Sequence, residues 1–347
     1  MDGLKERRKP KIAMIVDVYN WAFYNRAVVL KEKLADYYDI KIIPADTALE
    51  NNMLQLILML KGYDLVHFFW RRILFNLSNE NYIFKRNNID ADEFIKENFT
   101  NIKKTTCIPD HLLLDEENIE ENKKAINLMD AYYTVSDKLY KIYNDLDGIK
   151  KPYGTIINGV NLNIFKPKNL ERFENRENKK LVVGWSGNSK WGGEGYEDIK
   201  GIRTILIPAI ESLKKEGYNI ELKMADSSKK LTPIHEMPDY YKTIDVYVCM
   251  SKTEGSPNPI LECMACGVPI ISTDVSFVKD VLGEKQQKYI VNERNIECLK
   301  AKLIDIYNNQ SILKELSQEN IQRAPKYSYD NLIDKHREFF DYTLKKR

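Results

Sequence analysis

The sequence predicts an α/β protein built from two doubly wound domains, each around a parallel sheet. Its length of 347 residues favours two domains over one. Short apolar runs rich in Ile, Val and Tyr alternate with longer stretches of helical period, which is typical of βαβ units. Residues 162–180 are polar and lack periodicity, so we expect them to link the two domains.

The first series of elements runs to residue 160. Its expected strands are short runs of apolar, β-branched and aromatic residues, and its expected helices have apolar residues at helical spacing. In chain order the segments are KIAMIVDVY, helix 21–38, IKIIP, helix 50–61, DLVHFF, helix 70–87, TTCIP, helix 116–129, AYYTVS, a helix ending near Asn144, and YGTIINGV.

The second series begins after the linker. Its segments are LVVGWSG (181–187), helix 200–217, NIELKMAD, IDVYVCMS (244–251), a helix from about 259, VPIIST (268–273), YIV, and helices 295–309 and 311–323. The last segment, YSYDNLIDKHREFFDYTLKKR, is amphipathic, with apolar positions at Leu332, Phe339, Phe340 and Leu344. Two such domains facing each other would form a ligand cleft at the carboxyl ends of both sheets.

Composition excludes several classes of protein. Hydrophobic residues make up 43% and charged residues 30%, which argues against disorder, and a net charge of +2 argues against a nucleic-acid binder. The first apolar run is too short for a signal peptide or a membrane span, so we expect a cytoplasmic protein.

The chain has five cysteines, an odd number that suggests reduced thiols. The lone pair Cys263 and Cys266 is better explained by packing than by metal or redox chemistry.

Two glutamates flank a Ser-Pro-Asn-Pro turn. Asn258 fits an N-cap and Pro259 the first helical position, which places Glu262 in the first turn of a helix. Such a helix end favours an anion, most often a phosphate, and Gly255 lets the backbone approach it. The alternative is that Glu262 only complements the helix dipole and Glu254 is a solvated loop residue.

A second stretch strengthens the phosphate interpretation. Asp198 can cap a helix whose first turn contains Lys200, with Arg203 just beyond. Cations there oppose the helix dipole unless an anion lies between them. We therefore expect Lys200, and also Lys190, to bind phosphate, whereas a solvated face remains the alternative for Arg203.

The stretch EGSPNPILECMACGVPIIST resembles the E-x7-E signature of family 4 of the retaining nucleotide-sugar glycosyltransferases, which have the GT-B fold. Four further segments are similar to family elements in the same order: AYYTVSDKLYKIY, GTIINGVNLNIFKP, LVVGWSGN with DIKGI, and PDYYKTIDVYVCMS. The resemblance spans residues 130–283. It implies two Rossmann-like domains, 1–165 for the acceptor and 166–326 for the nucleotide sugar, facing across a cleft. A C-terminal helix, 327–347, would cross back to pack on the N-terminal domain.

The resemblance also implies roles for individual residues. Glu262 would bind the ribose hydroxyls, for which a carboxylate supplies two acceptor oxygens. Glu254 would orient the donor sugar, and Lys200 would neutralise the departing diphosphate. The turn whose amides face the sugar and diphosphate would comprise Gly255, Ser256, Pro257 and Asn258. His111, after TTCIP, holds the position where the family often keeps a histidine near the donor sugar; a structural histidine is the alternative.

This chain departs from the family at two positions. The family usually has Gly-Arg after the first strand of the C-terminal domain, whereas Asn188 follows Gly187 here, and Lys190 is our candidate replacement. The family's Gly-Gly turn is replaced by VYNWAFYNRA, where backbone amides near Ala22 and Phe23 could serve instead, with Asn25 and Arg26 as alternatives. Of the other histidines, we expect His67 in the core or at its rim, and His336 at the surface.

The implied activity is the transfer of a sugar, with retention, from a UDP- or GDP-linked donor to a glycan, lipid-linked or protein-linked acceptor, in cell-surface polysaccharide or glycoconjugate synthesis. We expect neither a metal nor a cofactor, because Asp90-Ala-Asp92 and Asp145-Leu-Asp147 fit caps and turns. A catalytically impaired nucleotide-sugar-binding protein and a GT-B epimerase are the alternatives. KERRKPK at 5–11 and the arginines at 71–72 are compatible with contact with an anionic membrane, and a solvated tail is the alternative for the first.

Overall fold

The computed structural model describes residues 8–45, 53–76, 82–176, 179–191 and 197–346. The chain divides into two units. The first domain comprises residues 1–157 together with 332–347, and the second comprises residues 158–331. The sequence placed the boundaries after residues 165 and 326. Lys5 to Arg7 of KERRKPK lie outside the described residues, as do parts of the helices expected at 50–61 and 70–87.

The first domain contains a five-stranded sheet in the order β2-β1-β3-β4-β5. Every neighbouring pair is parallel, and Ile12 lies opposite both Ile40 and Leu65. The strands are β1 (Lys11–Val16), β2 (Asp39–Pro44), β3 (Leu65–Phe68), β4 (Lys103–Ile108) and β5 (Ala131–Thr134). The alternating sequence pattern therefore predicted the class of this sheet correctly.

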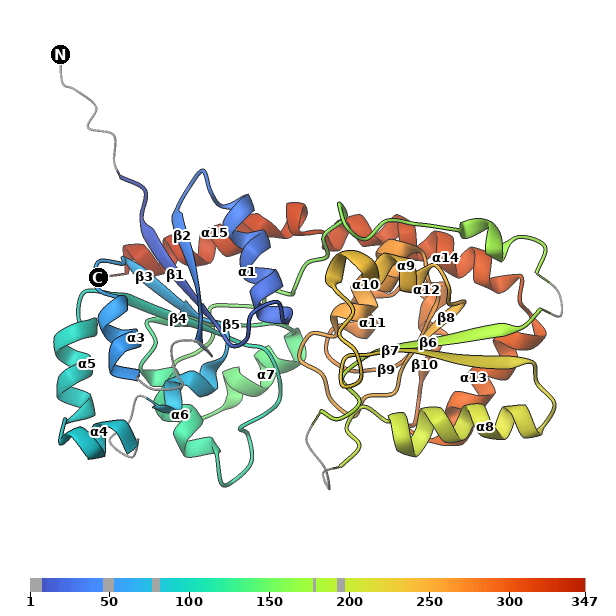
Figure 1. The fold of residues 1–347 in the computed structure, drawn as a ribbon, viewed down its shortest axis with the longest axis horizontal. Helices are drawn as coiled ribbons and strands as arrows, with labels where there is room; N and C mark the ends of the chain where they lie inside the picture. The colour runs from blue at the N-terminus through green and yellow to red at the C-terminus, as the bar shows by residue number, and fades with distance from the viewer. Residues whose placement is uncertain (1–7, 46–52, 77–81, 177–178, 192–196, 347) are drawn as a thin grey trace, which may run out of the picture. The chain divides into compact units, whose positions relative to one another are not determined.

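Helices pack on both faces of this sheet (Figure 1). They are α1 (Ala22–Lys33), α3 (Met53–Met59), the 3-10 helix Arg71–Asn76, α4 (Tyr82–Asn87), α5 (Ala91–Phe99), α6 (Ile119–Asn127) and α7 (Asp137–Asp145). Successive residues of β1 enter different cores, because side chains alternate along a strand. Met14 packs with residues of α1, and Ile15 packs with residues of α3 and α5.

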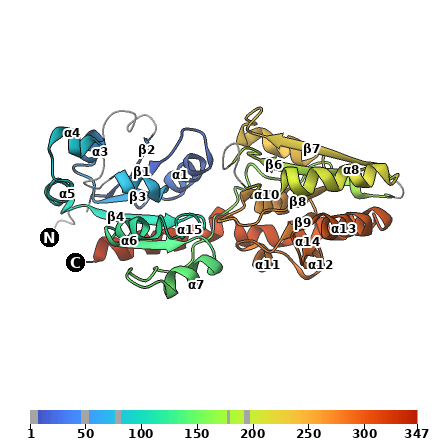
Figure 2. The same ribbon diagram turned by 90° about the horizontal axis from the view of Figure 1, so that it is seen from below.

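The second domain has the same plan, with a sheet in the order β10-β9-β8-β6-β7 and parallel pairing throughout. Its strands are β6 (Leu181–Gly187), β7 (Ile220–Asp226), β8 (Val246–Cys249), β9 (Ile270–Thr273) and β10 (Ile290–Val291). Its helices are the 3-10 helix Leu170–Phe173, the π-helical turn Ile202–Leu206, α8 (Ile207–Lys215), the 3-10 helix Ile234–Glu236, α9 (Met237–Tyr241), α10 (Asn258–Cys266), α11 (Val278–Val281), α12 (Glu284–Gln287), α13 (Ile296–Asn308), α14 (Ile312–Arg323) and the 3-10 helix Ala324–Tyr327. Helix α8 runs beside β7 in both ribbon views (Figures 1 and 2).

The final helix, α15 (Tyr329–Lys345), belongs to the first domain from Leu332 onward. Phe339 and Phe340 are 0% exposed in the core of that domain, and Leu344 packs against it. The amphipathic pattern thus predicted the buried face of α15 correctly. None of the helices among the described residues combines the length and the apolar character needed to cross a lipid bilayer.

The strand expected at YGTIINGV is absent from the described structure. In its place, single bridges link Thr155 to Thr134 and Val160 to Ser328. The bridge at Val160 requires a close approach of two backbones, since a Cβ on Gly159 would lie 2.9 Å from the backbone nitrogen of Tyr329.

His336 is also not at the surface, because it is 0% exposed. Its Nε2 lies 3.1 Å from Nη2 of Arg26, a side chain of α1. Burial lowers the pKa of His336 to about 3, so the ring is neutral. His67 is 0% exposed as well, in agreement with the expected core position.

Candidate functional site

The candidate site lies at the carboxyl end of the second sheet. Strand β6 has β7 on one side and β8 on the other, so the order of connections reverses between β6 and β8. Loops that follow such strands diverge and leave a crevice, which is where open α/β sheets bind ligands. The loop after β6 carries Asn188 and Lys190, and the loop after β8 carries Glu254 and the turn 255–258.

Lys200 and Glu254 form an ion pair although they are far apart in sequence. Nζ of Lys200 lies 2.6 Å from Oε1 of Glu254, and the same oxygen accepts a hydrogen bond from Oγ of Ser251 at 2.6 Å. The side chains are 22% and 15% exposed, so both remain within reach of a ligand. Lys200 also lies 5.4 Å from the ring centroid of Trp191. Two of the predicted site residues are therefore brought into direct contact.

The backbone around Lys200 is tightly constrained. Gly201 has φ +68°, and a Cβ there would lie 2.4 Å from the carbonyl oxygen of Met250, so only glycine fits. Arg294 donates from Nε to the same carbonyl at 2.8 Å and from Nη2 to the carbonyl of Asp198. The segment preceding the helix is thus fastened to the end of β8.

The N-cap of the following helical segment is Gly201, and not Asp198 as the sequence predicted. Asp198 nevertheless binds the start of this segment. Its carboxylate accepts hydrogen bonds from the backbone N–H groups of Ile202, Arg203 and Thr204 at 3.2, 2.7 and 2.8 Å. The segment begins with a π-helical turn, however, and Lys200 precedes that turn instead of lying in a first α-helical turn. Lys200 therefore lies one residue before the N-cap, Gly201, and not inside the helix.

Hydrogen bonds from residues elsewhere in the second domain hold the turn 255–258 in place. Oγ of Ser276 donates to the carbonyl of Gly255, and Nδ2 of Asn158 donates to Oδ1 of Asn258 at 3.2 Å. Oγ of Ser256 is buried and has no hydrogen-bond partner among the described residues. A buried hydroxyl without a partner is costly, so this atom is suited to contact a ligand.

Asn258 is not the N-cap of α10. It is the first helical residue, and Pro257 occupies the cap position without a side-chain hydrogen bond. Pro259 has no N–H, and the N–H of Ile260 donates to the carbonyl of Pro257 at 3.0 Å. The first turn of α10 therefore offers fewer free amides to an anion than the sequence suggested.

Glu262 lies on α10 and is half-buried. Its Oε2 accepts a hydrogen bond of 2.6 Å from the hydroxyl of Tyr241, the last residue of α9. Burial raises the pKa of Glu262 to about 7, although the hydrogen bond from Tyr241 opposes that rise. The tyrosine fixes one carboxyl oxygen and leaves the other, Oε1, as an acceptor.

The loop after β6 is organised by Asp226, the last residue of β7. This carboxylate is 5% exposed. It accepts hydrogen bonds from the backbone N–H and the hydroxyl of Ser189 at 3.1 and 2.6 Å, and from both groups of Ser228. Oδ1 of Asn188 caps the N–H of Lys190 at 2.9 Å, and the Lys190 side chain is exposed.

His111 lies in the first domain, three residues after the end of β4, and is half-buried. It follows Asp110, which is bound to Arg71 at the carboxyl end of the first sheet. The structure thus places His111 among loops at a strand end, as the strand TTCIP predicted.

Two groups of side chains in the chain could be considered as metal ligands, the cysteines and the Asp-x-Asp pairs. All five cysteines are free thiols, and Cys263 and Cys266 are buried in α10, where burial raises the pKa of Cys266 to about 12. Among the described residues, no group of three or more His, Cys, Asp or Glu side chains is arranged to hold a metal ion. Asp90 caps α5 by accepting from the N–H of Glu93 at 2.9 Å, as predicted.

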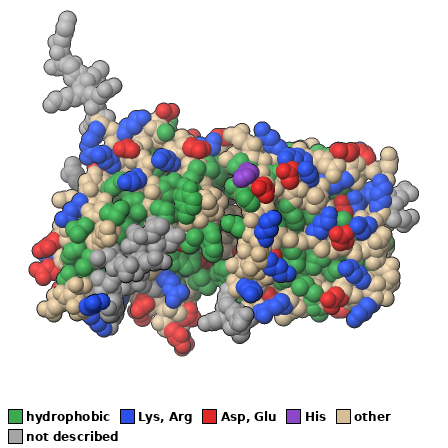
Figure 3. Space-filling model, viewed as in Figure 1, with side chains coloured by type: hydrophobic (Ala, Val, Ile, Leu, Met, Phe, Trp, Pro, Cys, Tyr) green, Lys and Arg blue, Asp and Glu red, His purple; other side chains and the backbone are tan. Residues whose placement is uncertain are grey.

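Acidic and basic side chains are interspersed over the visible face of the second domain (Figure 3). This agrees with the nearly balanced charge of the chain. Recognition of an anionic ligand must therefore rely on particular side chains, such as Lys200, more than on a field of one sign.

Sequence reasoning assigned no role to Tyr241, Asp226, Ser251 or Arg294. Tyr241 stood within PDYYKTIDVYVCMS, but its hydroxyl contact with Glu262 depends on the packing of α9 against α10. Asp226 ends a strand, which is a position where polar residues in α/β sheets often serve a ligand site. The position of Asp226 at the end of a strand could therefore have marked it as a candidate site residue.

Comparison with known proteins identifies related sequences. Residues 229–326 match the family model described as glycosyl transferases group 1. An uncharacterized glycosyltransferase of Haemophilus influenzae is 23% identical over 224 residues, covering 61% of this chain and 59% of that protein. The putative teichuronic acid biosynthesis glycosyltransferase TuaC of Bacillus subtilis is 30% identical over 123 residues, covering 35% and 29%. The chain thus matches less than two thirds of the length of these curated relatives.

Two solved structures share the architecture over nearly the whole chain. Sucrose-phosphate synthase from Thermosynechococcus elongatus has a TM-score of 0.71 at 15% identity, covering 96% of this chain and 99% of that one. HepE of Anabaena, in complex with UDP and glucose, has a TM-score of 0.67 at 11% identity with the same coverage. The chain therefore has the GT-B fold, and its second domain contains a segment related to the group 1 glycosyl transferases.

Proposed function

We propose that the protein is a retaining glycosyltransferase that moves a sugar from a UDP- or GDP-linked donor to a glycan, lipid-linked or protein-linked acceptor. The observation that carries the proposal is the pairing of Lys200 with Glu254 at 2.6 Å, in the loops that follow β6 and β8. The match of residues 229–326 to group 1 glycosyl transferases supports it.

Transfer of a sugar from a nucleotide sugar is favoured by positive charge beside the leaving diphosphate. Breaking the anomeric C–O bond of a nucleotide sugar leaves an oxocarbenium-like carbon and a nucleoside diphosphate. Lys200 would stabilise the negative charge that develops on the diphosphate, as a preorganised cation in a partly buried site. Glu254 holds the ammonium group of Lys200 in place, which fixes the position of the lysine side chain.

The two glutamates would divide the recognition of the donor. Oε1 of Glu262 is available to a ribose hydroxyl while Tyr241 holds Oε2. Glu254 would exchange its bond from Ser251 for bonds from hydroxyls of the donor sugar. Retention would follow from attack on the same face as the leaving group, with a phosphate oxygen of the diphosphate taking the proton of the acceptor hydroxyl. That route needs no protein nucleophile, and we propose that it needs no metal ion.

The biological setting is proposed from the relatives. TuaC is described as a putative teichuronic acid biosynthesis glycosyltransferase. Another relative, from Escherichia coli, is described as an O-antigen chain mannosyltransferase and is 24% identical over 140 residues. We therefore propose a role in cell-surface polysaccharide or glycoconjugate synthesis.

The decisive experiment compares Lys200→Ala with Lys252→Ala. Lys252 is exposed and pairs with exposed Glu197 in the same domain, so it is a matched control. We expect purified protein to release a nucleoside diphosphate from one member of a UDP- and GDP-sugar panel. Loss of Lys200 should lower turnover on the order of 10²-fold, and loss of Lys252 should leave it unchanged.

The same assay separates the alternatives. Unchanged turnover in Lys200→Ala would remove the lysine from the mechanism. Donor binding without release of diphosphate by the parent protein would indicate a binding protein, and release of a free epimer would indicate an epimerase. Activity that disappears on addition of EDTA and returns with a divalent ion would overturn the proposed metal independence.

A further inference from the structure

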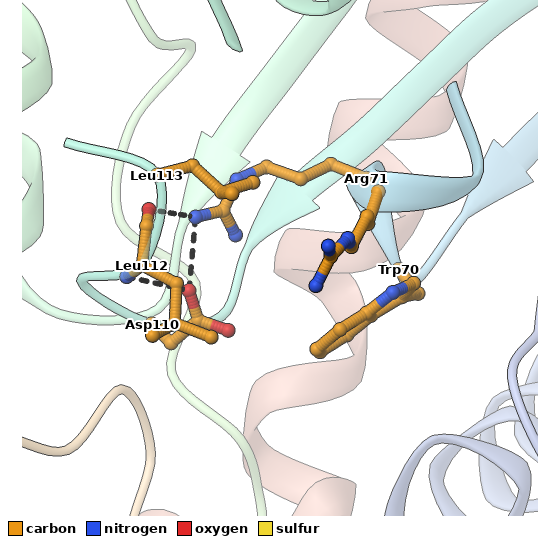
Figure 4. A pocket seen from close by; sticks show the side chains of 6 residues that line it. Trp70, Arg71, Asp110, Leu112 and Leu113 are labelled. Atoms are coloured by element: carbon orange, nitrogen blue, oxygen red, sulfur yellow. Dashed lines mark hydrogen bonds and ion pairs between the residues drawn. The ribbon is translucent and has the colours of Figure 1, made fainter. Parts of the chain in front are cut away.

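A pocket in the first domain lies at the carboxyl end of its sheet (Figure 4). Trp70, Arg71 and Arg72 follow β3, and Asp110 precedes Leu112 and Leu113 in the segment that follows β4; these six residues line the pocket. Because β3 and β4 are adjacent and parallel, their outgoing segments meet at one edge of the sheet.

Arg71 is a buried cation with part of its hydrogen-bonding capacity unused. It is 2% exposed. Nη2 donates to Oδ1 of Asp110 at 2.9 Å and to the carbonyl of Leu112, as Figure 4 shows, and Nε donates to Oδ1 of Asn122 at 3.3 Å. Nη1 takes part in none of these three bonds. A rigidly held guanidinium with a remaining N–H pair is suited to an anion, because arginine binds carboxylate or phosphate through two parallel hydrogen bonds.

More positive than negative groups line the pocket. Two guanidinium groups and one carboxylate give an excess of one positive charge. Asp110 already pairs with Arg71. Arg72 is exposed and makes no hydrogen bond or ion pair with any residue that the structure describes. A ligand with one negative charge would balance the pocket.

The rest of the lining suits a sugar ring. The half-buried indole of Trp70 and the side chains of Leu112 and Leu113 provide apolar surface, and the C–H face of a pyranose packs on such surface. Oδ1 of Asp110 accepts from Arg71 and from the N–H of Leu112 at 3.0 Å, while no described residue donates to Oδ2. That oxygen is available to a sugar hydroxyl.

We propose that this pocket binds an acidic sugar unit of the acceptor, namely a hexose that carries a carboxylate or a phosphate. The proposal rests on the proposed glycosyltransferase function, because it names the acceptor class of that reaction. The anionic group lies against Arg72 and Nη1 of Arg71, the ring packs on Trp70, and a hydroxyl donates to Asp110. A lipid surface is a poorer fit for these two arginines, since Arg71 is buried and a flat surface cannot reach it.

The test uses the full chain and two matched variants, Arg72→Gln and Lys31→Gln. Lys31 is an exposed cation in the last turn of α1. A helix that follows a parallel strand runs back toward the amino edge of the sheet, so Lys31 lies at the edge opposite the pocket. Binding of glucuronate, glucose 6-phosphate, glucose and inorganic phosphate is followed by the NMR signal of the Trp70 indole N–H.

We expect one of the two acidic sugars to shift the Trp70 signal with an affinity at least about tenfold above that of glucose or phosphate. Arg72→Gln should weaken this binding about tenfold or more and Lys31→Gln should leave it unchanged, with melting temperatures confirming that both variants fold. Equal binding by Arg72→Gln and the parent would overturn the proposal, as would glucose binding as tightly as the acidic sugars. Binding to anionic vesicles that depends on Arg72, without a response to the sugars, would overturn it in favour of a membrane contact.

The test of the acidic-sugar pocket can fail independently of the test of the transferase function. Nucleotide-sugar binding and diphosphate release depend on residues of the second domain and are measured without an acceptor. A protein that releases diphosphate but ignores acidic sugars refutes the pocket assignment alone. A protein that binds acidic sugars at Trp70 but never binds a nucleotide sugar refutes the transferase function alone.

Discussion

Glu262 is a carboxyl group that the folded protein keeps protonated at higher pH than an exposed glutamate. Burial raises its pKa to about 7 from the ordinary value of 4.5. Between these two values the folded state binds more protons than the unfolded chain. The free energy of unfolding therefore falls as pH rises from about 4.5 to about 7, and this group causes no further change above that range.

Replacing Glu262 with Gln should remove this pH dependence, because the amide has the shape of the carboxyl group but does not ionise. The variant should gain stability relative to the parent between pH 5 and pH 8, on the order of 1–3 kcal/mol. Urea denaturation at the two pH values measures the difference. Glu211→Gln, at an exposed position of α8, is the control. A difference between parent and Glu262→Gln that is the same at both pH values would contradict the assignment.

At the residue scale, the sequence offers candidates where the proposed chemistry depends on residue type and loop position. Lys200, Glu254 and Glu262 were singled out as candidates in that way. Their partners were not, because the bond from Tyr241 to Glu262 and the bond from Lys200 to Glu254 join residues 21 and 54 positions apart. Local patterns carry no information about which side chains tertiary packing brings together.

At the scale of elements, the loop after β6 depends on one carboxylate of the neighbouring strand. Burial alone would raise the pKa of Asp226, but hydrogen bonds from Ser189 and Ser228 outweigh it and lower the pKa. The charged form is thus the one that the loop stabilises. Its contribution to stability is present at neutral pH and is lost as pH falls through the lowered pKa.

Asp226→Ala should release the loop that carries Asn188 and Lys190. We expect a loss of about 2–4 kcal/mol in unfolding free energy at pH 7, because the donors of Ser189 and Ser228 lose their shared acceptor. Binding of UDP or GDP, measured by calorimetry, should weaken as well. Lys229→Ala, an exposed position three residues along, controls for local substitution. Unchanged stability and nucleotide affinity in Asp226→Ala would show that the loop holds its conformation without this residue.

Helices and strands with a strong period were predictable, whereas their ends were not. The helix expected at 200–217 starts with a π-helical turn, since Asp198 binds three successive N–H groups and Gly201 follows a left-handed path. The cap expected at Asn258 moved by one residue, because Pro257 and Pro259 restrict the backbone on both sides. Such ends depend on competing local hydrogen bonds that a periodic pattern does not contain.

At the scale of the whole molecule, the first domain is completed by a helix from the other end of the sequence. The buried face of α15 comprises Leu332, His336, Phe339, Phe340 and Thr343, which recur at helical spacing. The same spacing could have identified His336 as buried, had its polarity not suggested the surface. The fold class was predictable because alternation of strand and helix is a property of the whole chain.

Phe339→Ala tests how much α15 contributes to the stability of the first domain. Phe339 is 0% exposed, and its ring centroid lies 4.9 Å from that of Tyr133 in β5. Removing the ring should cost about 3–5 kcal/mol of unfolding free energy. Lys335→Ala, exposed on the same helix, should change it by less than about 0.5 kcal/mol. Chemical denaturation followed by circular dichroism compares the two, and equal stabilities would mean that α15 contributes little to the domain.

The return of α15 also sets an order of events during translation. All of residues 158–331 leave the ribosome before Phe339 and Phe340, which pack on β3 and β5, have been made. The second domain can therefore finish folding while the first domain still exposes the apolar surface that α15 will cover. A nascent chain in that interval is a natural client for chaperones that shield such surfaces.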